Sequence, residues 1–150
     1  MMKLTKHFTL TEFTQSQTAT RNGIPNGLDP SHPEQAEVIA NLKALCEEVL
    51  EPLRQRMGTP IVITSGYRCP KLNAAVGGAG NSQHTKGEAA DLHLPDEETG
   101  RKWFLWIRDH LPFDQLIWER ATPTSPRHWI HVSHSRRHNR QMVIANLCKQ

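Results

Sequence analysis

The chain has 150 residues, of which 37% are apolar and 22% charged, so it can bury one modest core but is too short for two ordinary domains. It has no run of 18 apolar residues and no apolar signal-peptide core, which argues against a membrane anchor and a built-in export signal. The formal charge of +3 is too small to indicate a nucleic-acid partner by itself. We therefore expect a single domain over residues 1–150.

The first part of the chain carries a short helical pattern and then a loop. Residues 10–17 predict one short helix, and residues 18–33, rich in Thr, Asn, Gly and Pro, predict an irregular surface segment. Ser31 and Glu34 have the spacing of a capping box, whose side chains satisfy free backbone N–H groups at the start of a helix. A second helix is therefore expected to begin there.

Apolar residues after this start recur at steps of three or four, which predicts a helix with one buried face. Pro52 is expected to bend the end of this helix, and Gly58 is expected to close it. The residues of the predicted buried face are Val38, Leu42, Leu45, Val49 and Leu53.

Strand patterns appear in the second half. Residues 61–64 are β-branched and favour a strand, and residues 88–94 predict another strand with Asp91 on its polar face. The remaining patterns predict a helix, two strands joined by a proline-rich turn, and a final strand or short helix, at residues 97–110, 114–119, 128–133 and 141–147. This mixture predicts an α+β fold with helices packed against a small antiparallel sheet.

Nine histidines, most of them from His84 onward, offer ligands for a metal ion. Zinc is bound by imidazole nitrogens and carboxylate oxygens, and a catalytic site has three protein ligands and one open position. His84 lies in a glycine-containing loop, Asp91 follows seven positions later in a predicted strand, and His131 lies in another predicted strand. A loop that folds back onto a sheet could bring these three side chains together.

The residues alone leave other triads open. His93 shares the predicted strand face of Asp91, and His128 and His134 flank His131 at three residues on either side. The three cysteines, by contrast, are widely spaced and form no C-x-x-C pair, so neither a cysteine zinc site nor a disulfide framework is expected. This cysteine usage fits a reducing compartment.

Several motifs in order resemble one family. Ser65-Gly-Tyr-Arg68, then Ser82-x-His84-x-x-Gly87-x-Ala89-x-Asp91, then Trp129-x-His131 resemble the D-Ala-D-Ala carboxypeptidase family of zinc peptidases, including its phage lysin and prophage branch. The resemblance implies that His84, Asp91 and His131 bind zinc. It also implies that His93, His128 and His134 are not zinc ligands. It also implies an α+β fold around a small antiparallel sheet.

Hydrolysis requires a group that moves a proton, and two residues are candidates. Related enzymes often place a carboxylate three residues before the last histidine ligand, but this chain has His128 there. Glu119, at the end of the preceding predicted strand, offers the carboxylate instead. The register of the hairpin between them decides which one shares the face of His131, because a slip of one residue reverses the face.

Two further residues are candidates for substrate binding. The resemblance makes Arg68 a clamp for a substrate carboxylate, and the alternative is a structural ion pair. Ser82 either bonds the substrate or fixes the loop of His84. The glycines at 77, 78 and 80 have no G-K-[ST] ending, so they favour a flexible rim loop over a phosphate-binding loop.

These patterns support a zinc peptidase that cuts the stem peptides of bacterial peptidoglycan, either as a carboxypeptidase or as an endolysin-type endopeptidase. A non-catalytic zinc-holding module that binds the cell wall is the alternative, as the related hedgehog signalling domain illustrates. Nucleic-acid binding by the basic residues 134–140 is disfavoured because the segment has no interleaved aromatic residues. The expectation is synthesis in the cytoplasm and action in the periplasm or cell wall after phage-type release, with the oligomeric state open.

Overall fold

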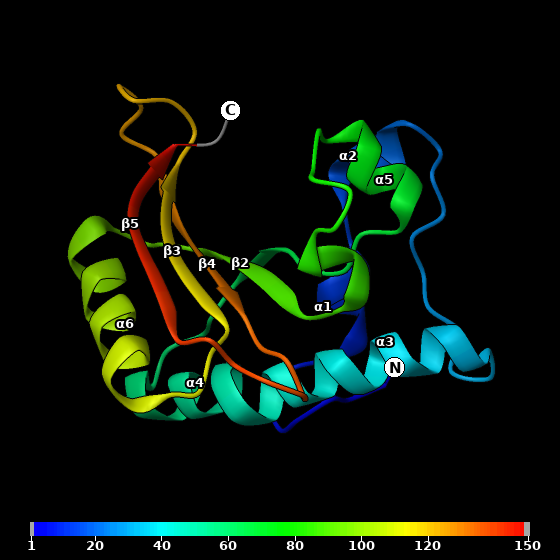
Figure 1. The fold of residues 1–150 in the computed structure, drawn as a ribbon, viewed down its shortest axis with the longest axis horizontal. Coiled ribbons are helices and arrows are strands. Elements are labelled where there is room, and N and C mark those ends of the chain that lie inside the picture. The colour runs from blue at the N-terminus through cyan, green and yellow to red at the C-terminus, as the bar shows by residue number, and fades with distance from the viewer. Residues whose placement is uncertain (1, 149–150) are drawn as a thin grey trace.

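The computed structural model describes residues 2–148. Helices and a sheet occupy separate parts of the molecule, which confirms the α+β fold class (Figure 1). In chain order the helices are α1 (Leu10–Thr14), α2 (Gln17–Arg21), α3 (Pro33–Leu45), the π-helix η1 (Cys46–Leu50), α4 (Glu51–Met57), α5 (Pro70–Ala75), the 3-10 helix η2 (Gln83–Lys86) and α6 (Glu97–His110). The strands are β1 (Ile63–Ser65), β2 (Ala89–His93), β3 (Gln115–Arg120), β4 (His128–Ser133) and β5 (Met142–Cys148).

Within the described residues, the strands form one five-stranded sheet in the order β1-β2-β4-β3-β5. The first three pairings are antiparallel, as expected, but β3 and β5 are parallel, so the sheet is mixed. The cause is the connection after β4. Because β4 ends beside the start of β3, the short segment 134–141 delivers β5 to the same end of β3, where Gln115 pairs with Met142.

Helices α3, η1, α4 and α6 pack against one face of the sheet (Figure 1). Alternation along β2 and β4 points Ala90, Leu92, Ile130 and Val132 into this core, where all four are fully buried. Asp91 and His131 alternate with them and therefore lie on the other face of the sheet. The fold thus separates an apolar face, which packs, from a polar face, which is available for chemistry.

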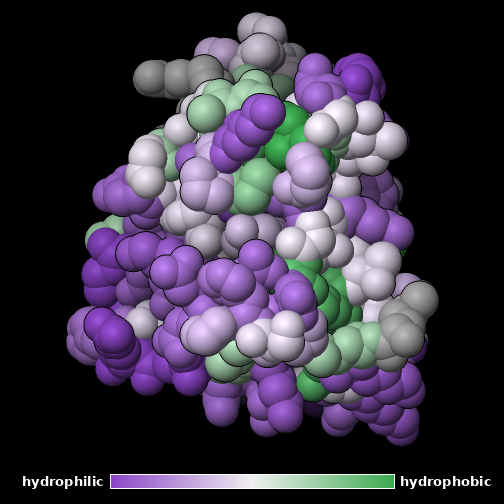
Figure 2. All heavy atoms as spheres, turned by 90° about the vertical axis from the view of Figure 1, so that its right-hand side faces the viewer, coloured by the Kyte–Doolittle hydropathy of each residue, from purple (hydrophilic) through white to green (hydrophobic). Residues whose placement is uncertain are grey.

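A second, smaller apolar cluster lies outside this core. Ala19 and Ile24 pack with Leu72, and the partly buried Cys69 and Val76 contact them. The cluster joins α2 to α5, which stand together apart from the sheet (Figure 1). The face of the molecule that lies on the right in Figure 1 is mainly hydrophilic (Figure 2). We call α2, α5 and the cluster between them the α2–α5 lobe.

Two predictions for the N-terminal helices are wrong. Residues 10–17 do not form one helix, because the chain turns between α1 and α2, and the Ser16 hydroxyl accepts a hydrogen bond from Ala19 N–H at the start of α2. The predicted capping box at Ser31 is wrong, because the Ser31 hydroxyl donates to Asp29 (2.8 Å) and Pro33 opens α3. A capping box does start α1, where Glu12 accepts from the backbone N–H of Thr9 (2.7 Å).

Pro52 is accommodated by a change of helix type. Proline has no N–H group, so the carbonyl of Glu48 has no donor four residues later. The chain widens into the π-helix η1 directly before this point and then continues as α4. Gly58 ends α4 in the left-handed conformation (φ +67°), as expected.

No helix in the described part of the chain is both long and apolar enough to cross a bilayer.

Glu51, at the start of α4, ties the N-terminal segment to the helices. Its carboxylate accepts from the backbone N–H of His7 (2.8 Å) and lies 2.6 Å from His7 Nδ1. Burial by itself favours the neutral acid, but these hydrogen bonds lower the pKa of Glu51 from 4.5 to about 2. The carboxylate therefore stabilises the fold above about pH 4.5, and this stabilisation is lost as the pH falls toward 2.

Replacing Glu51 with glutamine is expected to lower the free energy of unfolding by about 1–3 kcal/mol at pH 7, because the amide forms weaker bonds to His7. Between pH 5 and 2 the difference from the wild type should shrink. Urea denaturation at several pH values measures this, with the exposed Glu47→Gln as the control. A Glu51→Gln curve parallel to the wild-type curve over the whole pH range would contradict the assignment.

Candidate metal centre

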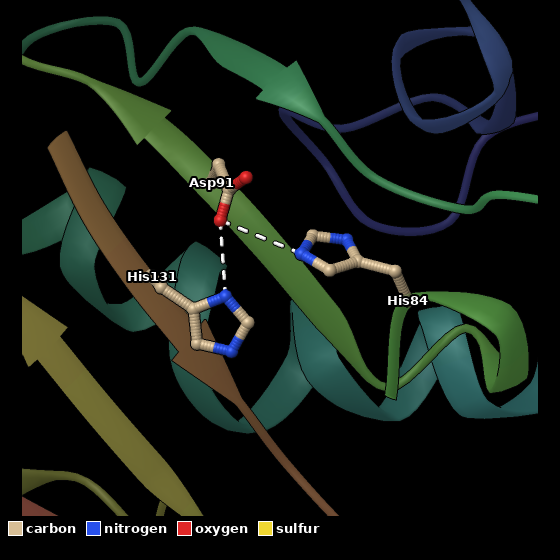
Figure 3. A group of neighbouring side chains, drawn as sticks. All are labelled: His84, Asp91 and His131. Carbon is tan, nitrogen blue, oxygen red and sulfur yellow. Dashed lines mark hydrogen bonds and ion pairs between the residues drawn. The ribbon is translucent and has the colours of Figure 1, made fainter. Parts of the chain in front are cut away.

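Three side chains from separate elements converge on the polar face of the sheet. His84 comes from η2, Asp91 from the middle of β2 and His131 from β4 (Figure 3). Their ligand atoms all lie within 4.8 Å of one another, and among the described residues only these three form such a group. Asp91 and His131 are brought together by strand register, because they are direct partners across β2 and β4. The folded-back loop brings His84 to them.

The Asp91 carboxylate lies at the centre of the group. Its Oδ1 atom is 3.0 Å from His131 Nδ1 and 3.5 Å from His84 Nε2 (Figure 3). Its Oδ2 atom faces the other way, 3.7 Å from a terminal nitrogen of Arg68. Burial alone would raise the pKa of Asp91, but the two histidines hold it well below its usual range. Asp91 is therefore a carboxylate anion at neutral pH.

The ring of His84 is oriented from behind by the backbone. His84 is only 3% exposed, and its Nδ1 atom lies 2.7 Å from the carbonyl oxygen of Gly66. Because a carbonyl can only accept, Nδ1 carries a proton, and Nε2 is the ring nitrogen that faces Asp91 and would be free to bind a metal ion. Ser82 supports the same loop, since its hydroxyl accepts from the backbone N–H of His84 (3.2 Å). The ring of His84 is therefore held in one orientation, as a preorganised metal ligand would need to be.

Gly66 can hold this position only without a side chain. A Cβ atom there would lie 2.7 Å from both Cα and the carbonyl oxygen of Phe13, whose backbone is fixed by a hydrogen bond from Tyr67 N–H (2.7 Å). The close approach of α1 to residue 66 therefore sets the position of the carbonyl that orients His84.

Replacing Gly66 with alanine is expected to destabilise the fold by about 2 kcal/mol through steric overlap. It should also weaken zinc binding about 10- to 100-fold, as loss of a group that orients a ligand does. Thermal denaturation and zinc titration against a chromophoric chelator measure the two effects. Gly27→Ala is the matched control, because its Cβ would meet no atom within 4 Å. Wild-type zinc affinity in the Gly66→Ala variant would contradict this role.

The register of β3 and β4 separates the two proton-shuttle candidates. Glu119 is the direct partner of Trp129, and Trp129 lies two residues from His131, so Glu119 lies on the same face of the sheet as His131 and Asp91. His128 pairs with Arg120 and lies on the opposite face. There, its Nδ1 atom accepts a hydrogen bond from Trp118 Nε1 (2.8 Å). No motif in the sequence indicates this tryptophan–histidine pair.

The Glu119 carboxyl is half-buried beside the ligands. Burial raises its pKa, the negative charge of Asp91 raises it further, and His131 partly opposes this. A carboxylate whose pKa is raised toward neutrality accepts a proton more readily and donates it again at neutral pH. Glu119 therefore lies on the same face of the sheet as Asp91 and His131, with a carboxyl group whose pKa lies above its ordinary value.

Arg68 lies beside the group and lines a cleft of about 670 Å³. Its Nε–H donates to Ser65 (3.2 Å), one terminal nitrogen donates to the Asn73 side chain (3.3 Å), and the other faces Asp91. The cleft also reaches Asp91, the start of α2 with the segment before it, and the turn between β3 and β4. Arg68 can therefore act both as an ion-pair partner of Asp91 and as an anchor for a molecule in the cleft.

The other histidines considered as ligands lie elsewhere. His93 is on the face of Asp91 but is exposed at the end of β2. His134 is buried after β4, and its backbone N–H donates to the carbonyl of Glu88 (2.8 Å). The basic segment 134–140 makes two ion pairs with other parts of the chain. Arg136 pairs with Glu37 (2.6 Å) and Arg140 pairs with Asp114 (2.8 Å), so both arginines contribute to tertiary contacts.

Two comparisons with known proteins bear on this site. The family model described as Peptidase M15 matches residues 6–133, a range that holds the three converging side chains, Arg68 and both shuttle candidates. A zinc D-Ala-D-Ala carboxypeptidase of Streptomyces albus G is 48% identical to this chain over 44 residues. That match covers 29% of this chain and 17% of the length of the relative.

Proposed function

Because the chain belongs to the peptidase M15 family, we propose that it is a zinc-dependent peptidase that hydrolyses peptide bonds in the stem peptides of bacterial peptidoglycan. The observation that carries the proposal is the convergence of His84, Asp91 and His131 beside a cleft, with Glu119 on the same face of the sheet. The peptidoglycan substrate is supported by the name of the partial relative and by the ordered motifs.

The donor set fits zinc. Two imidazole nitrogens and one carboxylate oxygen are the ligands of many catalytic zinc sites, which keep one further position for water or substrate. Bound there, zinc would polarise a peptide carbonyl and make a water molecule more acidic. The protein prepares the site by fixing the His84 tautomer through Gly66 and by keeping Asp91 ionised.

Glu119 is the proposed proton shuttle. Its carboxylate takes a proton from the attacking water and gives it to the amine that leaves when the peptide bond breaks. His128 is the weaker candidate, because it lies on the opposite face of β4 and its Nδ1 lone pair is already engaged by Trp118. Ser82 is assigned to the support of the His84 loop, where its hydroxyl is already bonded.

Arg68 is the proposed anchor for a carboxylate of the substrate. It faces the cleft beside Asp91, and a cation bound by Asp91 would leave the guanidinium charge available to a second anion. The cleft is several times larger than a single side chain would require and falls in the range of ligand sites, about 300–1,000 Å³. Both a terminal and an internal peptide bond remain within the proposal.

The test is incubation of the zinc-loaded protein with purified peptidoglycan and with defined stem peptides, followed by mass spectrometry of the products. Cleavage should stop after metal removal by a chelator and return when one equivalent of zinc is added. The masses of the products identify the bond that is cut. Stoichiometric zinc binding and cell-wall binding without any product would refute the peptidase and favour a non-catalytic cell-wall-binding module.

A further inference from the structure

Asn73 is a buried polar residue that the proposed reaction does not use directly. It lies in α5, is 4% exposed and uses both ends of its side-chain amide. The Oδ1 atom accepts from a terminal nitrogen of Arg68 (3.3 Å), and the Nδ2 group donates to the carbonyl of Ala79 (2.8 Å). Asn73 therefore connects the Arg68 guanidinium to the glycine-containing loop after α5.

The hydrogen bonds of Arg68 leave a defined part of the guanidinium free. Of its five N–H groups, the Nε–H is taken by Ser65, one is taken by Asn73, and one faces Asp91. One N–H group on each terminal nitrogen therefore remains available to a carboxylate in the cleft. Ser65 and Asn73 hold the guanidinium at two different nitrogens, which fixes its plane as well as its position.

Gly78 gives Asn73 the space that this contact needs. The backbone N–H of Gly78 donates to the carbonyl of Asn73 (2.8 Å), which places residue 78 against the Asn73 side chain. A Cβ atom at residue 78 would lie 2.1 Å from Asn73 Oδ1, the same atom that accepts from Arg68. At Gly80, in the same loop, a Cβ atom would meet nothing within 4 Å.

We propose that Asn73 is a positioning residue, which aims the Arg68 guanidinium at the carboxylate of a substrate in the cleft, and that Gly78 is required to keep Asn73 in this role. The hydrogen bond to Asn73 resists rotation of the guanidinium toward Asp91, its nearest anion. The carboxylate that Arg68 would bind rests on the proposed function. The orientation of Arg68 by Asn73 does not depend on that function, so the two can be tested separately.

The first measurement is independent of activity. In a proton–nitrogen correlation NMR spectrum, the Arg68 Nε–H signal, assigned by its loss in Arg68→Lys, should exchange slowly with water because it is buried and bonded. Asn73→Ala and Gly78→Ala should each speed this exchange about tenfold or more, whereas Gly80→Ala should leave it unchanged. Asn73→Asp keeps the acceptor for Arg68 and loses the donor to Ala79, so it should retain slow exchange.

The second measurement is cleavage of a peptide that ends in D-Ala-D-Ala, compared with the same peptide as its C-terminal amide. Asn73→Ala and Gly78→Ala should raise KM for the free acid about tenfold, as expected for one lost hydrogen bond to a charged group, with kcat and zinc content unchanged. The KM of the amide should not change. Asn73→Asp should retain the KM of the wild type.

The two measurements test the positioning role of Asn73 and the proposed peptidase function separately. Unchanged Arg68 exchange in both Asn73→Ala and Gly78→Ala would overturn the positioning role, as would an Asn73→Asp variant that behaves like Asn73→Ala, because Asn73 would then act only by tethering the loop. If the wild type cleaves no peptide, the proposed function fails, but the exchange data still decide whether Asn73 positions Arg68. Gly78 belongs to neither apolar cluster, so Gly78→Ala tests the role even where Asn73→Ala does not fold.

Discussion

The His84→Ala variant is expected to bind less than about a tenth of the zinc that the wild type binds and to lose peptide hydrolysis by about a thousandfold or more. The physical reason is the loss of one of three donors from a buried site. In the proposed site, His84 is the ligand whose ring is oriented by the carbonyl of Gly66, and the described residues offer no further ligand atom in the group to replace it. Asp91 then retains His131 and Arg68 as partners.

Zinc content by mass spectrometry or a chromophoric chelator, and hydrolysis of a stem peptide, measure the two losses. His93→Ala is the matched control, because His93 is an exposed histidine on the same strand face, two residues from Asp91, and does not belong to the group. It should retain one zinc ion per chain. Full zinc binding by His84→Ala, or zinc loss in His93→Ala, would refute the assignment of the ligands.

The Glu119→Gln variant is expected to keep its zinc and its stability while kcat falls about 10²- to 10⁴-fold, the usual contribution of a general acid–base group. Glutamine has nearly the same shape as glutamate and can occupy the same place opposite Trp129, but it cannot take up a proton at neutral pH. The loss should therefore appear in kcat, with little change in KM.

The His128→Gln variant provides the comparison, because His128 was the other candidate from the sequence. On the opposite face, with Nδ1 bonded to Trp118, it should lose much less than Glu119→Gln. Steady-state kinetics with one stem peptide ranks the two variants directly. A larger loss of kcat in His128→Gln would transfer the shuttle role to the histidine.

The fold class followed from local patterns, which the structure retains. The strand predicted at residues 128–133 is β4 with the same bounds, and the helix predicted at residues 97–110 is α6. The N-terminal region was less predictable because its boundaries depend on competing local bonds. Asp29 captures the Ser31 hydroxyl that was expected to cap α3, and Pro52 changes the helix type in a way that periodicity does not reveal.

The residues of the candidate site could be predicted only because several sequence motifs follow one another in the same order as in a known family. Spacing alone could not choose among the histidines, because the choice depends on which strand faces meet. The register of β3 and β4 is a tertiary property, and it alone places Glu119 with His131 and separates His128 from them. Asn73 had no signal of its own, since its contacts with Arg68 and Ala79 appear only when the loop is folded.

The α2–α5 lobe has a small apolar centre, formed by Ala19, Ile24 and Leu72, that is separate from the main core. Such a unit can detach at a small free-energy cost while β2, β3 and β4 stay paired. Its amides should exchange with deuterium through partial opening, long before those of the sheet. Leu72 and Val76 line one wall of the cleft, so a partial opening of this lobe would widen the cleft while the sheet stays folded.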